Sequence, residues 1–126
     1  MSATLRSVSL LRSFGFALEG VSYLIRTQRS AQIEIVIGVV VIAVAVWLGI
    51  NALEWAVLVL AMALVLALEA LNTAIELAVT LASPERHPLA KAAKDVAAAM
   101  VLIAAIGAVV VGVIVLGPRL AVVGTR

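Results

Sequence analysis

The stretch VAAAMVLIAAIGAVVVGVIVLGP, from Val96 to Pro118, decides the fold because its 23 consecutive residues carry no charge. About 20 apolar residues are enough for a helix to cross the hydrocarbon core of a bilayer. A charge at the centre of that core costs about 2.5 to 3.5 kcal/mol, so charged residues mark where a span begins and ends. We therefore predict a membrane-spanning helix that ends at Gly117-Pro118, since proline seldom continues a helix.

The same rule gives two further spans. Nineteen uncharged residues lie between Glu34 and Glu54, which allows one crossing. Only 14 lie between Glu54 and Glu69, so the next helix crosses only if it continues through Glu69 and Glu76 toward Ala82. That middle helix must carry carboxylates at membrane depth or at its edge. We predict spans at residues 33–51, 54–82 and 89–117.

The composition of the 126 residues also indicates a membrane protein. Hydrophobic residues make up 65% and charged residues 13%, whereas a soluble domain has about half and about a quarter. A water-soluble domain of this size could not bury so much apolar surface. The chain has no cysteine, which excludes disulfides and thiolate sites, and its net charge of +2 gives no reason to expect a nucleic-acid partner. We expect one all-α integral membrane domain over residues 1–126.

The basic residues predict the orientation. Seven of the nine precede span one or lie between spans two and three, which places them on one side of the membrane. Only two lie on the other side. Because basic residues are enriched in cytoplasmic loops, the N-terminus and the second loop should be cytoplasmic. The seven are Arg6, Arg12, Arg26, Arg29, Arg86, Lys91 and Lys94, and the two are Arg119 and Arg126.

The first thirty residues lack the early apolar core and cleavage site of a signal peptide. Apolar residues instead recur at intervals of three and four, and charged residues recur every seven on another face. This pattern predicts an amphipathic surface helix at residues 5–29, lying in the cytoplasmic interface. A plain membrane anchor is the simpler alternative. The apolar set is Leu11, Phe14, Leu18, Val21 and Ile25, and the charged set is Arg12, Glu19 and Arg26.

Glu69, Asn72 and Glu76 share one face of span two. At 100° per residue, Asn72 lies about 60° and Glu76 about 20° around the helix from Glu69. The seven-residue step from Glu69 to Glu76 covers roughly 10 Å, the depth of a triphosphate with its metal and an acceptor hydroxyl. These residues either join helices by hydrogen bonds or form a functional site, and intramembrane ionisable residues favour the second reading. Three thin spans could hardly enclose such a site, so we expect a homo-oligomer.

The second loop places further polar groups at the same surface. Ser83-Pro84 ends span two and His87-Pro88 starts the next helix. Lys91, Lys94 and Asp95 follow on its first two turns, where the lysines could hold phosphates or simply enforce the topology. A lone histidine such as His87 is more often structural than a ligand. The sequence contains no phosphate-binding glycine loop and no HExxH motif.

Together these segments resemble a known family. The octapeptide EALNTAIE at Glu69–Glu76 is followed eighteen residues later by Lys94-Asp95 within AAKDVAA at 92–98. This combination is similar to the signature of the small prokaryotic diacylglycerol kinases and undecaprenol kinases. The likeness extends to Arg12-Ser13-Phe14, to the three spans, and to SPERHPLAK at 83–91, which looks more like the undecaprenol kinase branch.

The resemblance implies an ATP- and magnesium-dependent kinase that phosphorylates the hydroxyl of a membrane lipid in the bacterial inner membrane. Such enzymes are homotrimers whose sites are shared between neighbouring subunits. By this likeness Glu69 would be the base that takes the lipid hydroxyl proton, and Glu76 would bind the metal. The remaining expected contacts to the nucleotide are Asn72, Glu85, His87, Lys94 and Asp95.

Two positions depart from the family pattern. Gln28 stands where the family usually has a second metal-binding glutamate, and Thr80 stands where an aspartate commonly follows Glu76. An amide oxygen can ligate magnesium but brings no charge, so Gln28 should weaken metal binding unless Glu34 or another group compensates.

The substrate and the function class each leave an alternative. Diacylglycerol is recycled for phospholipid synthesis, whereas undecaprenol carries cell-wall sugars, and both present one hydroxyl on apolar tails. The loop likeness favours undecaprenol. The alternative from another class is a small oligomeric channel or non-enzymatic scaffold in which Glu69 and Glu76 line a polar path. Such a pore would not require the loop that carries Lys94-Asp95.

Overall fold

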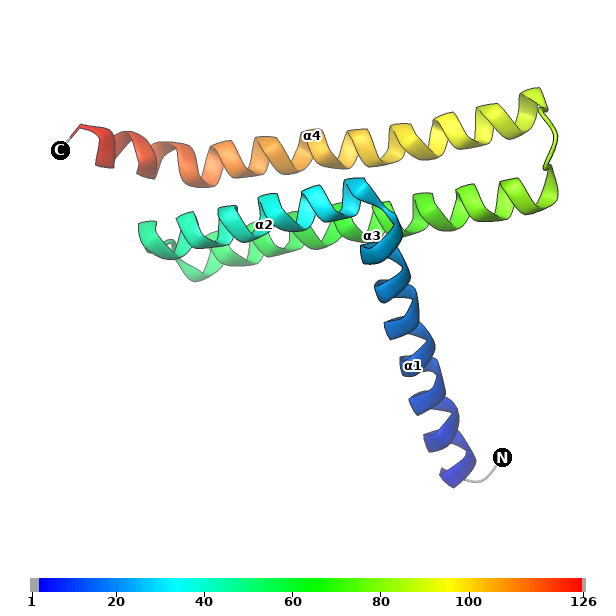
Figure 1. Cartoon of the computed structure of the whole chain (residues 1–126). Helices are drawn as coiled ribbons and strands as arrows, with labels where there is room; N and C mark the ends of the chain where they lie inside the picture. The colour runs from blue at the N-terminus through cyan, green and yellow to red at the C-terminus, as the bar shows by residue number, and fades with distance from the viewer. Residues whose placement is uncertain (1–2, 126) are drawn as a thin grey trace.

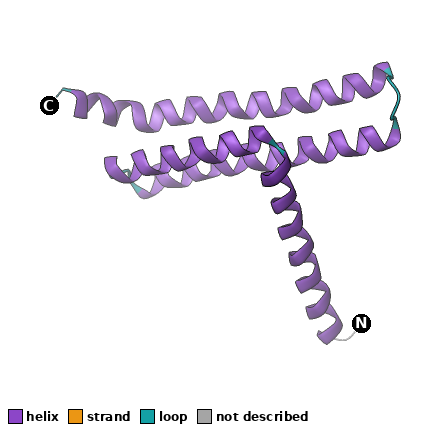
Figure 2. Cartoon of the chain, viewed as in Figure 1, coloured by secondary structure: helices purple, strands orange, loops and turns teal. Residues whose placement is uncertain are grey.

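The computed structural model describes residues 3–125, and all regular structure in this range is helical (Figure 2). Two of the basic residues used to predict the orientation are not covered: Arg126 lies outside the described residues, and for Arg6 only the backbone is described. The helices are α1 (Ala3–Thr27), α2 (Arg29–Leu48), α3 (Ala52–Ala82) and α4 (Pro88–Gly124).

The prediction of three spans is confirmed, because α2, α3 and α4 are each long and apolar enough to cross a membrane. These three helices run side by side, while α1 leaves across their direction (Figure 1). The 31 residues of α3 give a length of about 46 Å, against about 30 Å for the 20 residues of α2. As a result, α3 and α4 continue past the start of α2 as a two-helix extension.

The connections follow from local sequence. Gly49 ends α2 in the left-handed conformation, with φ of 66°, and its N–H donates to the carbonyls of Ala45 and Val46. Asn51 then starts α3 through a capping box, in which its side chain accepts from the Glu54 N–H and the Glu54 carboxylate accepts from the Asn51 N–H. At the other end of α2, Gln28 is a single extended residue between α1 and α2.

The prediction that the third helix ends at Gly117-Pro118 is wrong. Helix α4 continues through Pro118 to Gly124, and its axis changes direction near its C-terminal end (Figure 1). Proline removes one backbone hydrogen bond and bends a helix, but the surrounding turns can stay paired, as they must within lipid. The continuation is held by Arg119, whose guanidinium donates to both carboxylate oxygens of Glu54 on α3.

Few side chains are buried within the protomer. The main buried cluster lies where α2, α3 and α4 meet near the α2–α3 turn, and it consists of Ala45, Ile50, Leu58, Val115 and Leu116. The chain exposes 9133 Å², whereas a compact protein of 13.0 kDa would expose about 6,300 Å². Most of the large apolar side chains along all four helices are among the exposed ones. Such a surface fits lipid or further protein, but not water.

Candidate functional site

Glu69 lies where α3 passes the start of α2. Its side chain is only 3% exposed, and its Oε1 accepts a hydrogen bond of 2.5 Å from the Ser30 hydroxyl on α2. The carboxyl of Glu34, one turn further along α2 from Ser30, lies near enough to interact electrostatically with that of Glu69. Glu69 therefore belongs to a cluster of polar side chains from two helices, in a span that is mostly apolar.

Two further buried polar residues lie next to Glu69 along α3. Thr73 is buried and its hydroxyl donates to the Glu69 carbonyl over 3.0 Å. Asn72 is buried too, and its Oδ1 has no hydrogen-bond partner among the described residues; the same holds for Oε2 of Glu34. A buried acceptor without a donor costs about 1 to 3 kcal/mol, so these oxygens favour a ligand or water that brings O–H or N–H groups.

A second feature lies further along α3, in the two-helix extension. Glu76, Thr80 and Lys94 line a groove of about 830 Å³, together with the apolar side chains of Leu77, Leu81 and Pro84. The Lys94 ammonium donates to the Thr80 hydroxyl over 3.0 Å. Because that partner is neutral, the charge of Lys94 remains available for an anion. The groove thus offers a cation and a half-buried carboxylate side by side.

The structure separates Lys94 from the other predicted nucleotide contacts. Asp95 forms an exposed ion pair of 2.6 Å with Lys91 and does not line the groove. His87 caps α4, since its Nδ1 accepts from the Leu89 N–H over 3.1 Å. Glu85 lies in the exposed α3–α4 loop, where its carbonyl accepts from the Ser83 hydroxyl. Among the described residues, none of these three forms a hydrogen bond or ion pair with Glu76.

The groove suits magnesium, which usually keeps several waters and binds one or two carboxylates plus substrate phosphates. Glu76 can supply one such carboxylate there. Among the described residues, no three His, Asp or Glu side chains form a metal-binding cluster. Gln28 does not line the groove, and its side-chain amide donates to the Thr27 hydroxyl over 3.2 Å.

Sequence reasoning missed the role of Ser30 beside Glu69 and treated Glu34 only as a possible substitute for the missing glutamate. The signal was the four-residue spacing of these polar residues at the start of span one, which puts them on one helix face. The alignment of α2 with α3 decides which residue of α3 they contact. This alignment cannot be read from a single sequence.

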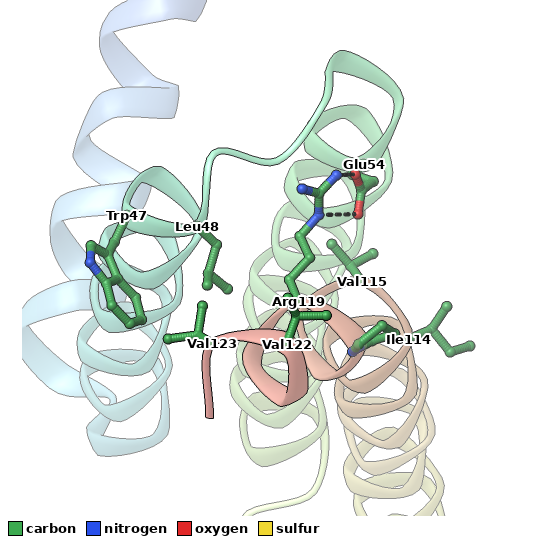
Figure 3. Close-up of a pocket in the computed structure, with 9 residues that line it drawn as sticks. Trp47, Leu48, Glu54, Ile114, Val115, Arg119, Val122 and Val123 are labelled. Carbon is green, nitrogen blue, oxygen red and sulfur yellow. Dashed lines mark hydrogen bonds and ion pairs between the residues drawn. The ribbon is translucent and has the colours of Figure 1, made fainter. Parts of the chain in front are cut away.

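A separate cavity of about 770 Å³ lies at the opposite end of the bundle, near the α2–α3 turn (Figure 3). Arg119 reaches from α4 to Glu54 on α3, and Val122, Val123 and Leu48 surround it with apolar side chains (Figure 3). No residue predicted to act in the site lines this cavity. Its ion pair therefore serves to fasten the end of α4.

Comparisons with known proteins agree on one family. The family model described as "Prokaryotic diacylglycerol kinase" matches residues 15–116. A Synechocystis diacylglycerol kinase is 50% identical over 113 residues, which cover 89% of this chain and 65% of that protein. The Bacillus subtilis undecaprenol kinase is 35% identical over 86% of this chain and 89% of its own. The Escherichia coli K12 diacylglycerol kinase is 32% identical over 85% and 88%.

Proposed function

The chain belongs to the prokaryotic diacylglycerol kinase family, which indicates a lipid kinase, and on this premise we propose that it uses ATP and magnesium to phosphorylate the hydroxyl of undecaprenol or diacylglycerol. The observation that carries the proposal is the buried Glu69 with its unpartnered polar neighbours, followed along the same helix by the groove of Glu76 and Lys94. The two features lie roughly 10 Å apart along α3, which suits a lipid hydroxyl at one and a triphosphate at the other.

In this proposal Glu69 is the general base. The lipid oxygen bonds to the γ-phosphorus, the bond from that phosphorus to ADP breaks, and the hydroxyl proton passes to the Glu69 carboxylate. A base must first lie within hydrogen-bond reach of the proton that it takes, and the Oδ1 of Asn72 can help to orient the same hydroxyl. Phosphoryl transfer otherwise needs positioning and charge neutralisation, not covalent help from the protein.

The groove supplies that neutralisation. Lys94 would hold phosphate oxygens as a point charge, and Glu76 would hold the metal. Gln28, the second expected ligand, would have to reach the metal from outside the groove lining. A magnesium ion held by these residues would supply positive charge to neutralise the phosphates. Glu85, His87 and Asp95 lie at the same end of the bundle and would contact the rest of the nucleotide.

The arrangement of the helices supports a cytoplasmic nucleotide. The extension of α3 and α4 that carries the groove lies beyond the point where α1 meets α2 (Figure 1). If α1 lies in the inner interface of a bacterial cytoplasmic membrane, this extension reaches into the cytoplasm, where ATP is present, while Glu69 stays at the depth of a lipid hydroxyl. This orientation agrees with the bias of basic residues toward the same end.

The decisive test gives the purified protein labelled ATP and magnesium with undecaprenol and with diacylglycerol in parallel. We expect labelled lipid phosphate, and we expect Glu69→Gln to lower its formation by at least a hundredfold. Glu19→Gln makes the same chemical change on the exposed face of α1 and should retain activity. Unchanged turnover in Glu69→Gln would remove Glu69 as the base.

The same assay decides the substrate. The likeness of the 83–91 loop favours undecaprenol, so we expect the higher kcat/KM with that lipid. A preference for diacylglycerol would overturn this choice and leave the kinase proposal intact. The absence of labelled lipid with both alcohols would favour the oligomeric channel or scaffold.

A further inference from the structure

We propose that Ser30 is a positioning residue for Glu69, holding one carboxylate oxygen so that the other faces the lipid hydroxyl. The role rests on the proposed kinase function. The hydrogen bond from the Ser30 hydroxyl to Glu69 Oε1 measures 2.5 Å and joins α2 to α3 across 39 residues of sequence. It is the only hydrogen bond from another helix to this carboxylate among the described side chains.

Glu69 needs such a partner because of its surroundings. The carboxyl of Glu34 on α2 is near enough to interact with it electrostatically, and two ionised carboxylates repel each other. A hydrogen bond from a hydroxyl to a carboxylate is short and about twice as strong as a neutral one. The Glu69 side chain has three torsions and could relieve this repulsion by turning away. The hydrogen bond from Ser30 can therefore hold Glu69 in one rotamer.

The hydrogen bond from Ser30 matters for catalysis because it engages only one of the two carboxylate oxygens of Glu69. Oε1 is occupied by Ser30, so Oε2 is the oxygen free to take the proton that the lipid hydroxyl loses when it bonds to phosphorus. Ser30 keeps its own proton throughout and does not enter the reaction. Misplacing a reacting group by about 1 Å can cost a hundredfold in rate, so losing this contact should affect turnover more than binding.

The first test compares steady-state kinetics of wild type, Ser30→Ala and Ser30→Thr. We expect Ser30→Ala to lower kcat by ten- to a hundredfold while KM for ATP and for lipid changes less than threefold. Ser30→Thr retains a hydroxyl on the same carbon and should recover most of the kcat. Ser22→Ala, which removes an exposed hydroxyl from α1, is the matched control and should behave as wild type.

The outcomes separate this role from its alternatives. An unchanged kcat in Ser30→Ala, or a Ser30→Thr variant as slow as Ser30→Ala, would overturn the role and leave the kinase function standing. A wild type without turnover on either lipid would overturn the function itself.

A second measurement tests whether the Ser30→Ala variant is slow only because it is less stable. Thermal unfolding of Ser30→Ala, Glu69→Gln and the double variant tests the contact directly. We expect the two changes to be coupled, with the double variant less destabilised than the sum of the singles. Additive effects would show that the contact contributes nothing.

Discussion

At the scale of single residues, the groove differs from the family pattern in its charge. Thr80 gives Lys94 a neutral hydroxyl where an aspartate is common in the family, so the ammonium has a hydrogen-bond acceptor without a counter-charge. A carboxylate at this position would compete with phosphate for the same cation. Thr80 therefore makes the groove more attractive to a polyphosphate.

Thr80→Asp tests this reading of the groove. We expect KM for ATP to rise about three- to tenfold, because Lys94 would pair with the new carboxylate, while kcat changes little. Thr80→Ser keeps the hydroxyl and serves as the control, with KM close to that of wild type. Steady-state kinetics with ATP varied at saturating lipid measure both values. A KM for ATP that falls in Thr80→Asp would show that Lys94 does not hold phosphate.

Gln28 leads to a prediction about magnesium. If its amide oxygen is a weak ligand beside Glu76, Gln28→Glu adds a charge and should lower the magnesium concentration for half-maximal activity several-fold. Gln32→Glu, one turn further along the chain, adds the same charge at another exposed position and is the control. Titration of activity with magnesium at fixed ATP gives the comparison. Identical curves for wild type and Gln28→Glu would place Gln28 outside the metal site.

Much of the residue-level site follows from helical periodicity alone. Glu69, Asn72 and Glu76 lie on α3 as their spacing predicts, and Lys94 lies beside Glu76 across the helix pair. Periodicity could not separate Lys94 from Asp95, because adjacent residues point about 100° apart and only the packing of α4 decides which one faces α3. The Ser30–Glu69 contact could not be predicted for a similar reason, since it depends on how α2 and α3 are aligned along their axes.

At the scale of elements, three spans follow from the uncharged stretches, but the length of α4 does not. A proline preceded by glycine is an ordinary stop signal, and here it bends a helix that then continues. The helix continues because Arg119, the residue after the proline, forms an ion pair with Glu54 on α3. Glu54 already caps α3 through Asn51, so one carboxylate holds both the start of α3 and the end of α4.

The ion pair should therefore stabilise the end of the bundle. Glu54→Gln retains an acceptor for the Asn51 N–H but loses the charge, and Arg119→Met keeps an extended side chain without charge. We expect each change to lower the unfolding temperature and the double variant to be no worse than the more affected single. Thermal unfolding in one detergent at fixed salt measures the cycle. Strictly additive shifts would mean that the pair contributes nothing to stability.

At the scale of the whole molecule, the protomer leaves most of its apolar surface uncovered, and its polar groups gather at two separated ends. The polar cluster around Glu69 lies between α2 and α3, while the other faces of these helices present apolar side chains outward. Lipid can cover such faces, but a site that excludes water around a transferring phosphoryl group must be enclosed by protein. Further copies of the chain can supply them, in agreement with the homotrimer that the family resemblance implies.

Mixed oligomers test whether neighbouring chains share a site. Glu69→Gln removes the proposed base, and Lys94→Met removes the proposed phosphate contact, so each variant alone should be nearly inactive. If the base of one chain serves the nucleotide groove of a neighbour, unfolding the two variants together and refolding them as a mixture will create some sites with both residues intact. Such sharing predicts that the mixture recovers activity well above the sum of the separately refolded variants, because those sites carry no substitution. A mixture no more active than that sum, although cross-linking shows that mixed oligomers have formed, would mean that Glu69 and Lys94 act within one chain.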